Sequence, residues 1–145
     1  MAGPEKHLPE ETQKAFDDAR DQLLTIHKAL LDHERARYEK KHGAIGSVSA
    51  LLQLVIDHPW FLYLKQLSAL ITEMDEFTAS KTPPPTLEGA RAILAQAQRL
   101  LSPNESGSHF QQSYLKAIQD SPDIAYLHGE WKKRSKQESS AIVKE

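Results

Sequence analysis

The chain has 145 residues, of which 39% are hydrophobic and 26% are charged, and its formal net charge is −2. That balance excludes a global basic field, so we expect neither nucleic acid nor a membrane surface as a partner. The absence of cysteine excludes disulfides, thiolate metal sites and cysteine nucleophiles, and it suits a cytoplasmic location. The length predicts one domain.

The N-terminal part of the chain predicts a short arm followed by one long helix. Residues 1–9 contain two prolines and few apolar side chains, which is typical of a flexible arm. They also lack the apolar core of an export signal, in keeping with a cytoplasmic protein. From Glu11 to His42, apolar or small residues recur every three or four positions without Gly or Pro, which predicts a bundle helix. Gly43 then supplies a helix stop.

One side of this helix carries His27, Glu34 and Tyr38 beside its apolar face. His27 and Glu34 are seven positions apart, so they share a side of the helix but lie about 10.5 Å apart along its axis, too far to hold one ion. The preferred interpretation places both at the edge of the packed face with their polar tips in water. The alternative is a polar pocket for a small ligand or a metal, in which burial shifts their pKa values.

Metal binding by helical residues requires ligands three or four positions apart, as in Glu-x-x-His. His27 and His33 are six positions apart, which puts them about 120° from each other around the helix, and His42 lies at the helix end. We therefore predict neither a metal ion nor a cofactor.

A second long helix is predicted from Ser47 to about Thr78, because Ser47 is a good N-cap and the apolar spacing continues. Pro59 lacks an N–H group and crowds the preceding turn, so we expect the helix to kink or restart at this position, with His58 near its cap. The apolar face before the kink is formed by Leu51, Leu52, Val55 and Ile56.

The kink is the best candidate for a recognition feature, since aromatic residues beside irregular backbone often form pockets. His58 precedes Pro59, and Trp60, Phe61 and Tyr63 follow it. These neighbouring apolar side chains cannot all face one core, so at least one must face solvent, the connector or a partner. In the preferred interpretation the connector or the fifth helix covers the outward ring. The alternative is contact with a ligand or a partner.

The C-terminal half predicts three shorter helices after a stiff, proline-rich connector at 81–86. They are expected at about 87–101, 110–118 and 122–131. Residues 132–145 are polar, and we expect them to form a fraying tail.

Together these elements predict an all-α fold with a single domain at 10–131. The specific expectation is an antiparallel four-helix bundle with a long N-terminal helical hairpin, a Pro-kinked second helix and a short extra C-terminal helix. The first helix is about 48 Å long, whereas a compact globule of this size is under about 40 Å across. The hairpin must therefore bend around the core or project beyond it, where it offers a surface for self-association or a protein partner.

Three segments in the first half of the chain carry a resemblance to a group of short, uncharacterised bacterial all-helical proteins. They are His33–Glu39 (HERARYE), Leu51–Leu54 (LLQL) and Asp57–Phe61 (DHPWF). The group brings no established activity, cofactor or catalytic residue. The resemblance implies a bacterial cytoplasmic protein and nothing more specific.

The chain contains no nucleophile elbow, phosphate-binding glycine loop or paired-carboxylate signature, so an enzyme is not favoured. We predict a non-enzymatic binding or regulatory module that acts through protein–protein contacts near the Pro59 kink, with self-association or a protein partner. The alternative is a small-ligand or metal sensor with a polar pocket in the bundle core. The candidate binding residues are His27, Glu34, Tyr38, His58, Trp60, Phe61 and Tyr63.

Overall fold

The computed structural model describes the backbone of residues 8–144 and the side chains of residues 8–137. This part of the chain forms six α-helices and one turn of 3-10 helix, and it contains no strand. The elements are α1 (Glu10–His42), α2 (Val48–Asp57), η2 (Pro59–Phe61), α3 (Leu64–Ala79), α4 (Leu87–Leu100), α5 (His109–Asp120) and α6 (Pro122–Lys144). The predicted all-α class is confirmed. Most of the predicted arm, residues 1–7, lies outside the described residues. None of the helices in the described range is both long enough and apolar enough to cross a membrane.

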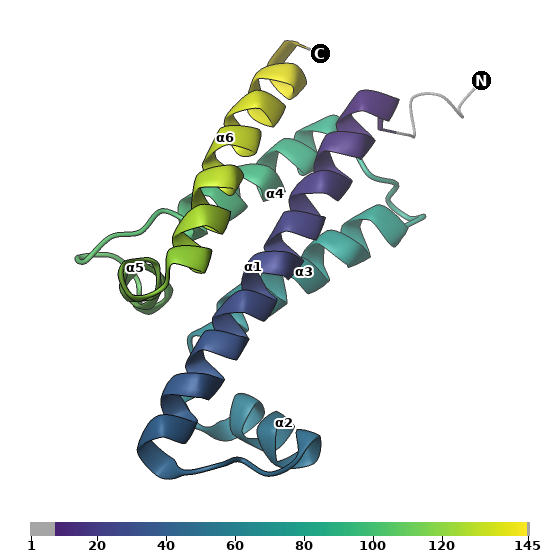
Figure 1. The fold of residues 1–145 in the computed structure, drawn as a ribbon. Coiled ribbons are helices and arrows are strands. Elements are labelled where there is room, and N and C mark those ends of the chain that lie inside the picture. The colour runs from purple at the N-terminus through teal and green to yellow at the C-terminus, as the bar shows by residue number, and fades with distance from the viewer. Residues whose placement is uncertain (1–7, 145) are drawn as a thin grey trace.

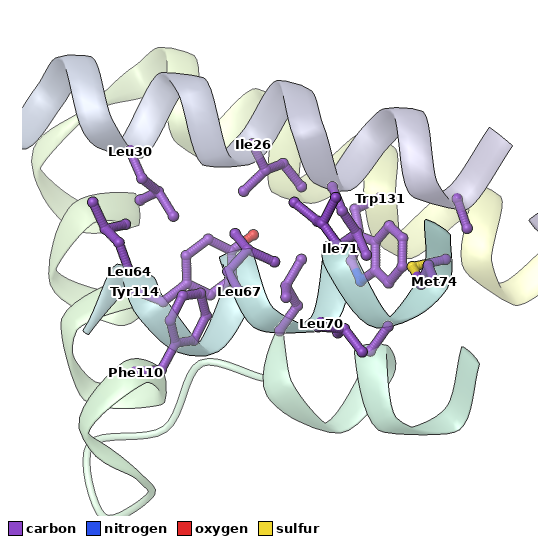
Figure 2. Close-up of a cluster of buried hydrophobic side chains, with 14 of the residues drawn as sticks. Ile26, Leu30, Leu64, Leu67, Leu70, Ile71, Met74, Phe110, Tyr114 and Trp131 are labelled. Carbon is purple, nitrogen blue, oxygen red and sulfur yellow. The ribbon is translucent and has the colours of Figure 1, made fainter. Parts of the chain in front are cut away.

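The central element is α1, which packs against α3, α4 and α6 (Figure 1). Its predicted apolar face is confirmed, because side chains at three–four spacing are all buried: Phe16, Ala19, Leu23, Ile26 and Leu30. Figure 2 shows Ile26 and Leu30 above the side chains of α3, with Phe110, Tyr114 and Trp131 from the C-terminal helices completing the core. Close packing of these faces excludes water from the contact and stabilises the fold.

The 33 residues of α1 give it a length of about 50 Å, and its C-terminal end passes beyond α4 and α6 (Figure 1). A short link then reverses the chain through Gly43 and Gly46, whose φ angles are 94° and 92°. Residues other than glycine rarely adopt such backbone angles. Ser47 caps the next helix by accepting a hydrogen bond from the Ala50 N–H at 3.0 Å. This geometry places α2 at the opposite end of the molecule from the start of α1 and the end of α6 (Figure 1).

The structure corrects half of the prediction for the apolar face of α2. Leu51 and Val55 are partly buried against the core, but no residue of α2 is fully buried, and Leu52 and Ile56 remain 56% and 55% exposed. The physical reason is that α1 extends beyond α4 and α6 (Figure 1). As a result α2 packs mainly against η2, and no helix covers the outer side of α2.

At Pro59 the chain restarts as a separate helical element and does not continue as one kinked helix, and His58 lies at the cap as predicted. His58 is extended, with φ −82° and ψ 133°, which favours accommodation of Pro59 at the next residue. A 3-10 turn over η2 and two further turn residues then lead into α3. The break changes the direction of the chain, so α3 packs along α1, whereas the main contacts of α2 are with η2.

The three C-terminal helices begin close to their predicted positions. A capping box starts α5, in which the Ser108 hydroxyl accepts from the Gln111 N–H and the Gln111 side chain accepts from the Ser108 N–H. By contrast, α6 continues to Lys144, well past Trp131, where the sequence predicts a polar tail. Arg134 of this extension lies 3.4 Å from the carboxylate of Asp18, so the extended helix contacts α1.

Candidate functional site

Glu34 is the most unusual buried residue near the kink, because its carboxylate is only 3% exposed. It accepts hydrogen bonds from the Tyr63 hydroxyl at 2.6 Å, the Trp60 indole N–H at 3.0 Å and the Arg37 Nη1 at 2.6 Å. A charge removed from water requires such donors. The preferred interpretation of Glu34, with its polar tip in water, is therefore wrong, and two of its three partners, Tyr63 and Trp60, come from the kink.

The kink presents these donors through its own local geometry. The backbone N–H of Trp60 donates to Nδ1 of His58 at 3.0 Å, which caps the 3-10 turn that Pro59 begins. Trp60 and Tyr63 are three residues apart, so this tight turn directs both toward α1. Burial raises the pKa of Tyr63, and the neighbouring charge of Glu34 raises it further. Tyr63 therefore stays protonated and acts as a donor.

An aromatic cluster joins the end of α1 to the kink. The Tyr38 ring centre lies 5.4 Å from that of His58, 5.5 Å from that of Trp60 and 5.7 Å from that of Phe61. The edge-to-face contacts with His58 and Trp60 are favourable arrangements for rings at this separation. The structure thus brings Tyr38 and Glu34 together with the kink residues that the sequence analysis nominated separately.

Side chains of α1 lie over Trp60, whereas the sequence analysis preferred the connector or the fifth helix as the cover of the outward ring. The guanidinium carbon of Arg37 lies 5.2 Å from the centre of the Trp60 ring, and Nζ of Lys41 lies 5.9 Å from it. Both distances are in the range of cation–π attraction. The side chain that faces outward is Leu62, which is 44% exposed.

His27 does not belong to this group. Its Nε2 lies 2.8 Å from the hydroxyl of Ser68 on α3, about two turns of α1 away from Glu34. Burial lowers its pKa, so the neutral ring is favoured. The polar row on α1 is consequently divided between two separate sets of partners.

A cavity of about 240 Å³ opens beside Glu34, between α1, the kink and one face of α5. Its lining residues are His33, Glu34, Arg37, Pro59, Trp60, Tyr63, His109, Ser113, Lys116, Ala117 and Asp120. Nε2 of His33 is buried and has no hydrogen-bond partner in the described structure.

Sequence reasoning did not nominate His33, Arg37 or the residues of α5. The spacing of His33 and Arg37, one turn apart and flanking Glu34, was a usable signal. No local signal links α5 to this site, because its residues lie more than 70 positions later in the chain.

The described residues contain no group of three or more His, Cys, Asp or Glu side chains arranged to hold a metal ion. No family model, curated protein or solved structure matches the chain. The argument for function therefore rests on the geometry of α2, the kink and the cavity.

Proposed function

We propose that the chain is a non-enzymatic protein-binding module that docks through α2, beside the Pro59 kink, onto a second copy of itself. The observation that carries the proposal is the exposure of Val48, Leu52 and Ile56, which are 72%, 56% and 55% exposed. They are four residues apart, so they form one stripe on α2, called here the α2 face. Grouped exposed apolar side chains of this kind typically mark an interaction surface.

The base of α2 is held firmly, which supports a docking role for its outer face. The His58 N–H donates to the Leu54 carbonyl at 2.8 Å and closes the end of α2. The bond from Trp60 to Glu34 then ties the next residues to α1. In this proposal α1, α3, α4 and α6 form an antiparallel four-helix bundle that serves as the scaffold, and α2 is the element that the scaffold presents.

The charge pattern of α2 favours a second copy as the partner. No charged residue occurs between Val48 and Ile56, and Asp57 stands at the C-terminal end. Antiparallel pairing about a two-fold axis near Leu52 places Val48 of each copy opposite Ile56 of the other. It also brings each Asp57 to the positive N-terminal end of the other α2, where a carboxylate is stabilised. Such a self-complementary patch is what a two-fold interface requires.

The size of the α2 face predicts a weak dimer. Full burial of a Val, Leu or Ile side chain stabilises by about 1.5–3 kcal/mol, and these side chains are already 28–45% covered. The three residues from each copy then contribute about 5–10 kcal/mol in total, from which association costs of at least about 4 kcal/mol are lost. At most about 6 kcal/mol remains, so we expect a Kd between about 40 µM and 1 mM.

Sedimentation velocity between about 10 µM and 1 mM spans this range of Kd. The average mass of the wild-type chain should rise toward that of a dimer, and Leu52→Glu should remain a monomer because a buried, unpaired carboxylate is costly. Ala92→Glu makes a matched control, since it adds the same charge at an exposed position of α4. A monomeric wild type at the highest concentration, or association of Leu52→Glu equal to that of the control, would contradict the proposal.

A further inference from the structure

We propose that the cavity between α1, the kink and α5 binds a small oxyanion, either a carboxylate or a phosphate. The site is independent of the α2 face. Its volume of about 240 Å³ is below the roughly 300–1,000 Å³ of sites for drug-sized ligands. This volume fits inorganic phosphate or a short organic acid.

The first support is the unpartnered nitrogen of His33. His33 lines the cavity, and its Nε2 is buried and makes no hydrogen bond within the described structure. Buried polar side-chain atoms nearly always have a partner, so an exception calls for water or a ligand. As the Nε2–H tautomer, His33 donates a hydrogen bond to an oxygen placed in the cavity.

The second support is the set of cationic groups in the cavity lining. Arg37 follows His33 by one turn on the same side of α1, and Lys116 reaches the cavity from α5. Arg37 donates to Glu34 through Nη1, and a guanidinium carries five N–H donors in total. Its remaining donors are suited to a planar or tetrahedral oxyanion. Ser113 of α5 adds a hydroxyl to the lining.

The carboxylate of Glu34 does not prevent anion binding, because it already accepts three hydrogen bonds from Tyr63, Trp60 and Arg37. Asp120 is the other carboxylate in the lining. Its charge opposes an anion and limits the affinity. The two acidic residues thus have different consequences, and a substitution at Asp120 tests the sign of the proposed charge preference.

The test follows the His33 ring in ¹H–¹⁵N spectra of the whole chain during titration with sodium phosphate and, separately, sodium succinate. Sodium chloride at matched ionic strength is the reference. We expect a saturable shift of the His33 Nε2 signal with phosphate, succinate or both, and the effective arm identifies the source of the oxyanion. Lys116→Gln should weaken binding about tenfold, the effect of losing one charge-assisted hydrogen bond. Asp120→Asn should tighten binding, and Leu52→Glu should leave it unchanged.

Lys65→Gln is the matched control, since it removes the same charge at an exposed position of α3. Neither Lys116 nor Asp120 is a partner of Glu34, so these variants keep the kink intact. The proposal is overturned if neither anion gives a saturable shift, or if chloride produces the same shift. It is also overturned if Lys116→Gln binds as tightly as Lys65→Gln, or if Asp120→Asn binds more weakly than the wild type.

Discussion

Replacing Glu34 by leucine removes the acceptor that ties the kink to α1. The Tyr63 hydroxyl, on a residue that is 5% exposed, then loses its partner, which costs about 1–3 kcal/mol for a buried donor. The half-buried Trp60 N–H adds about 1 kcal/mol. Arg37 adds little, because its side chain is 45% exposed and water can solvate it. We therefore expect Glu34→Leu to lower the free energy of unfolding by about 2–4 kcal/mol.

The opposing effect is that a leucine replaces a buried charge, which in some proteins is neutral or stabilising. That outcome requires the partners to be replaced too, and here Tyr63 and Trp60 keep their donors. In the double variant Glu34→Leu/Tyr63→Phe the unpaired hydroxyl is absent. The loss should therefore be about 1–2 kcal/mol smaller than the sum of the two single losses.

Urea unfolding followed by circular dichroism measures these differences, with Glu73→Leu on the exposed side of α3 as the control. The control should change the free energy of unfolding by no more than about 0.5 kcal/mol. The reasoning is refuted if Glu34→Leu is as stable as the wild type, or if the single effects simply add in the double variant.

Two further predictions concern stability. Burial lowers the pKa of His27 in the folded protein. The contribution of the neutral His27 ring to stability is therefore complete above the unfolded pKa of about 6.5. It is lost as the pH falls through the lower pKa of the folded state. His27→Gln, which can still bond Ser68, should make unfolding free energies measured in urea less dependent on pH between about 7 and 5; an unchanged slope would contradict this. Gly43→Ala should lower the thermal midpoint because of the φ of 94°, whereas Gly129→Ala, within α6 and with nothing near its added Cβ, should raise it. Equal shifts in these two variants would contradict the backbone argument.

The all-α class and the extent of α1 were predictable because they depend on local periodicity. The spacing of Phe16, Leu23 and Leu30 is a property of the helix itself, and all three are buried. The exposure of α2 was not predictable in this way. An apolar spacing at Leu52 and Ile56 indicates a face, but whether anything covers that face depends on how far α1 extends beyond its neighbours.

The candidate site was predictable only in its separate parts. The sequence nominated Glu34 for its place on an apolar helix and Trp60 for its place after a proline. Their contact spans 26 positions of chain, and it depends on how the 3-10 turn docks on α1. His27 was nominated with Glu34 because both lie on one side of α1, yet residues about two turns apart meet different neighbours.

The central claim is that α2 faces pair between two copies of the chain. The chain has no cysteine, so Leu52→Cys introduces a unique thiol next to the proposed two-fold axis. The most direct measurement is the rate of disulfide formation at millimolar concentration, followed by intact mass and compared with Ala92→Cys. Pairing of the α2 faces brings the two thiols within the short distance that a disulfide requires, so Leu52→Cys should form a covalent dimer much faster than the control. Equal rates in the two variants would contradict the account.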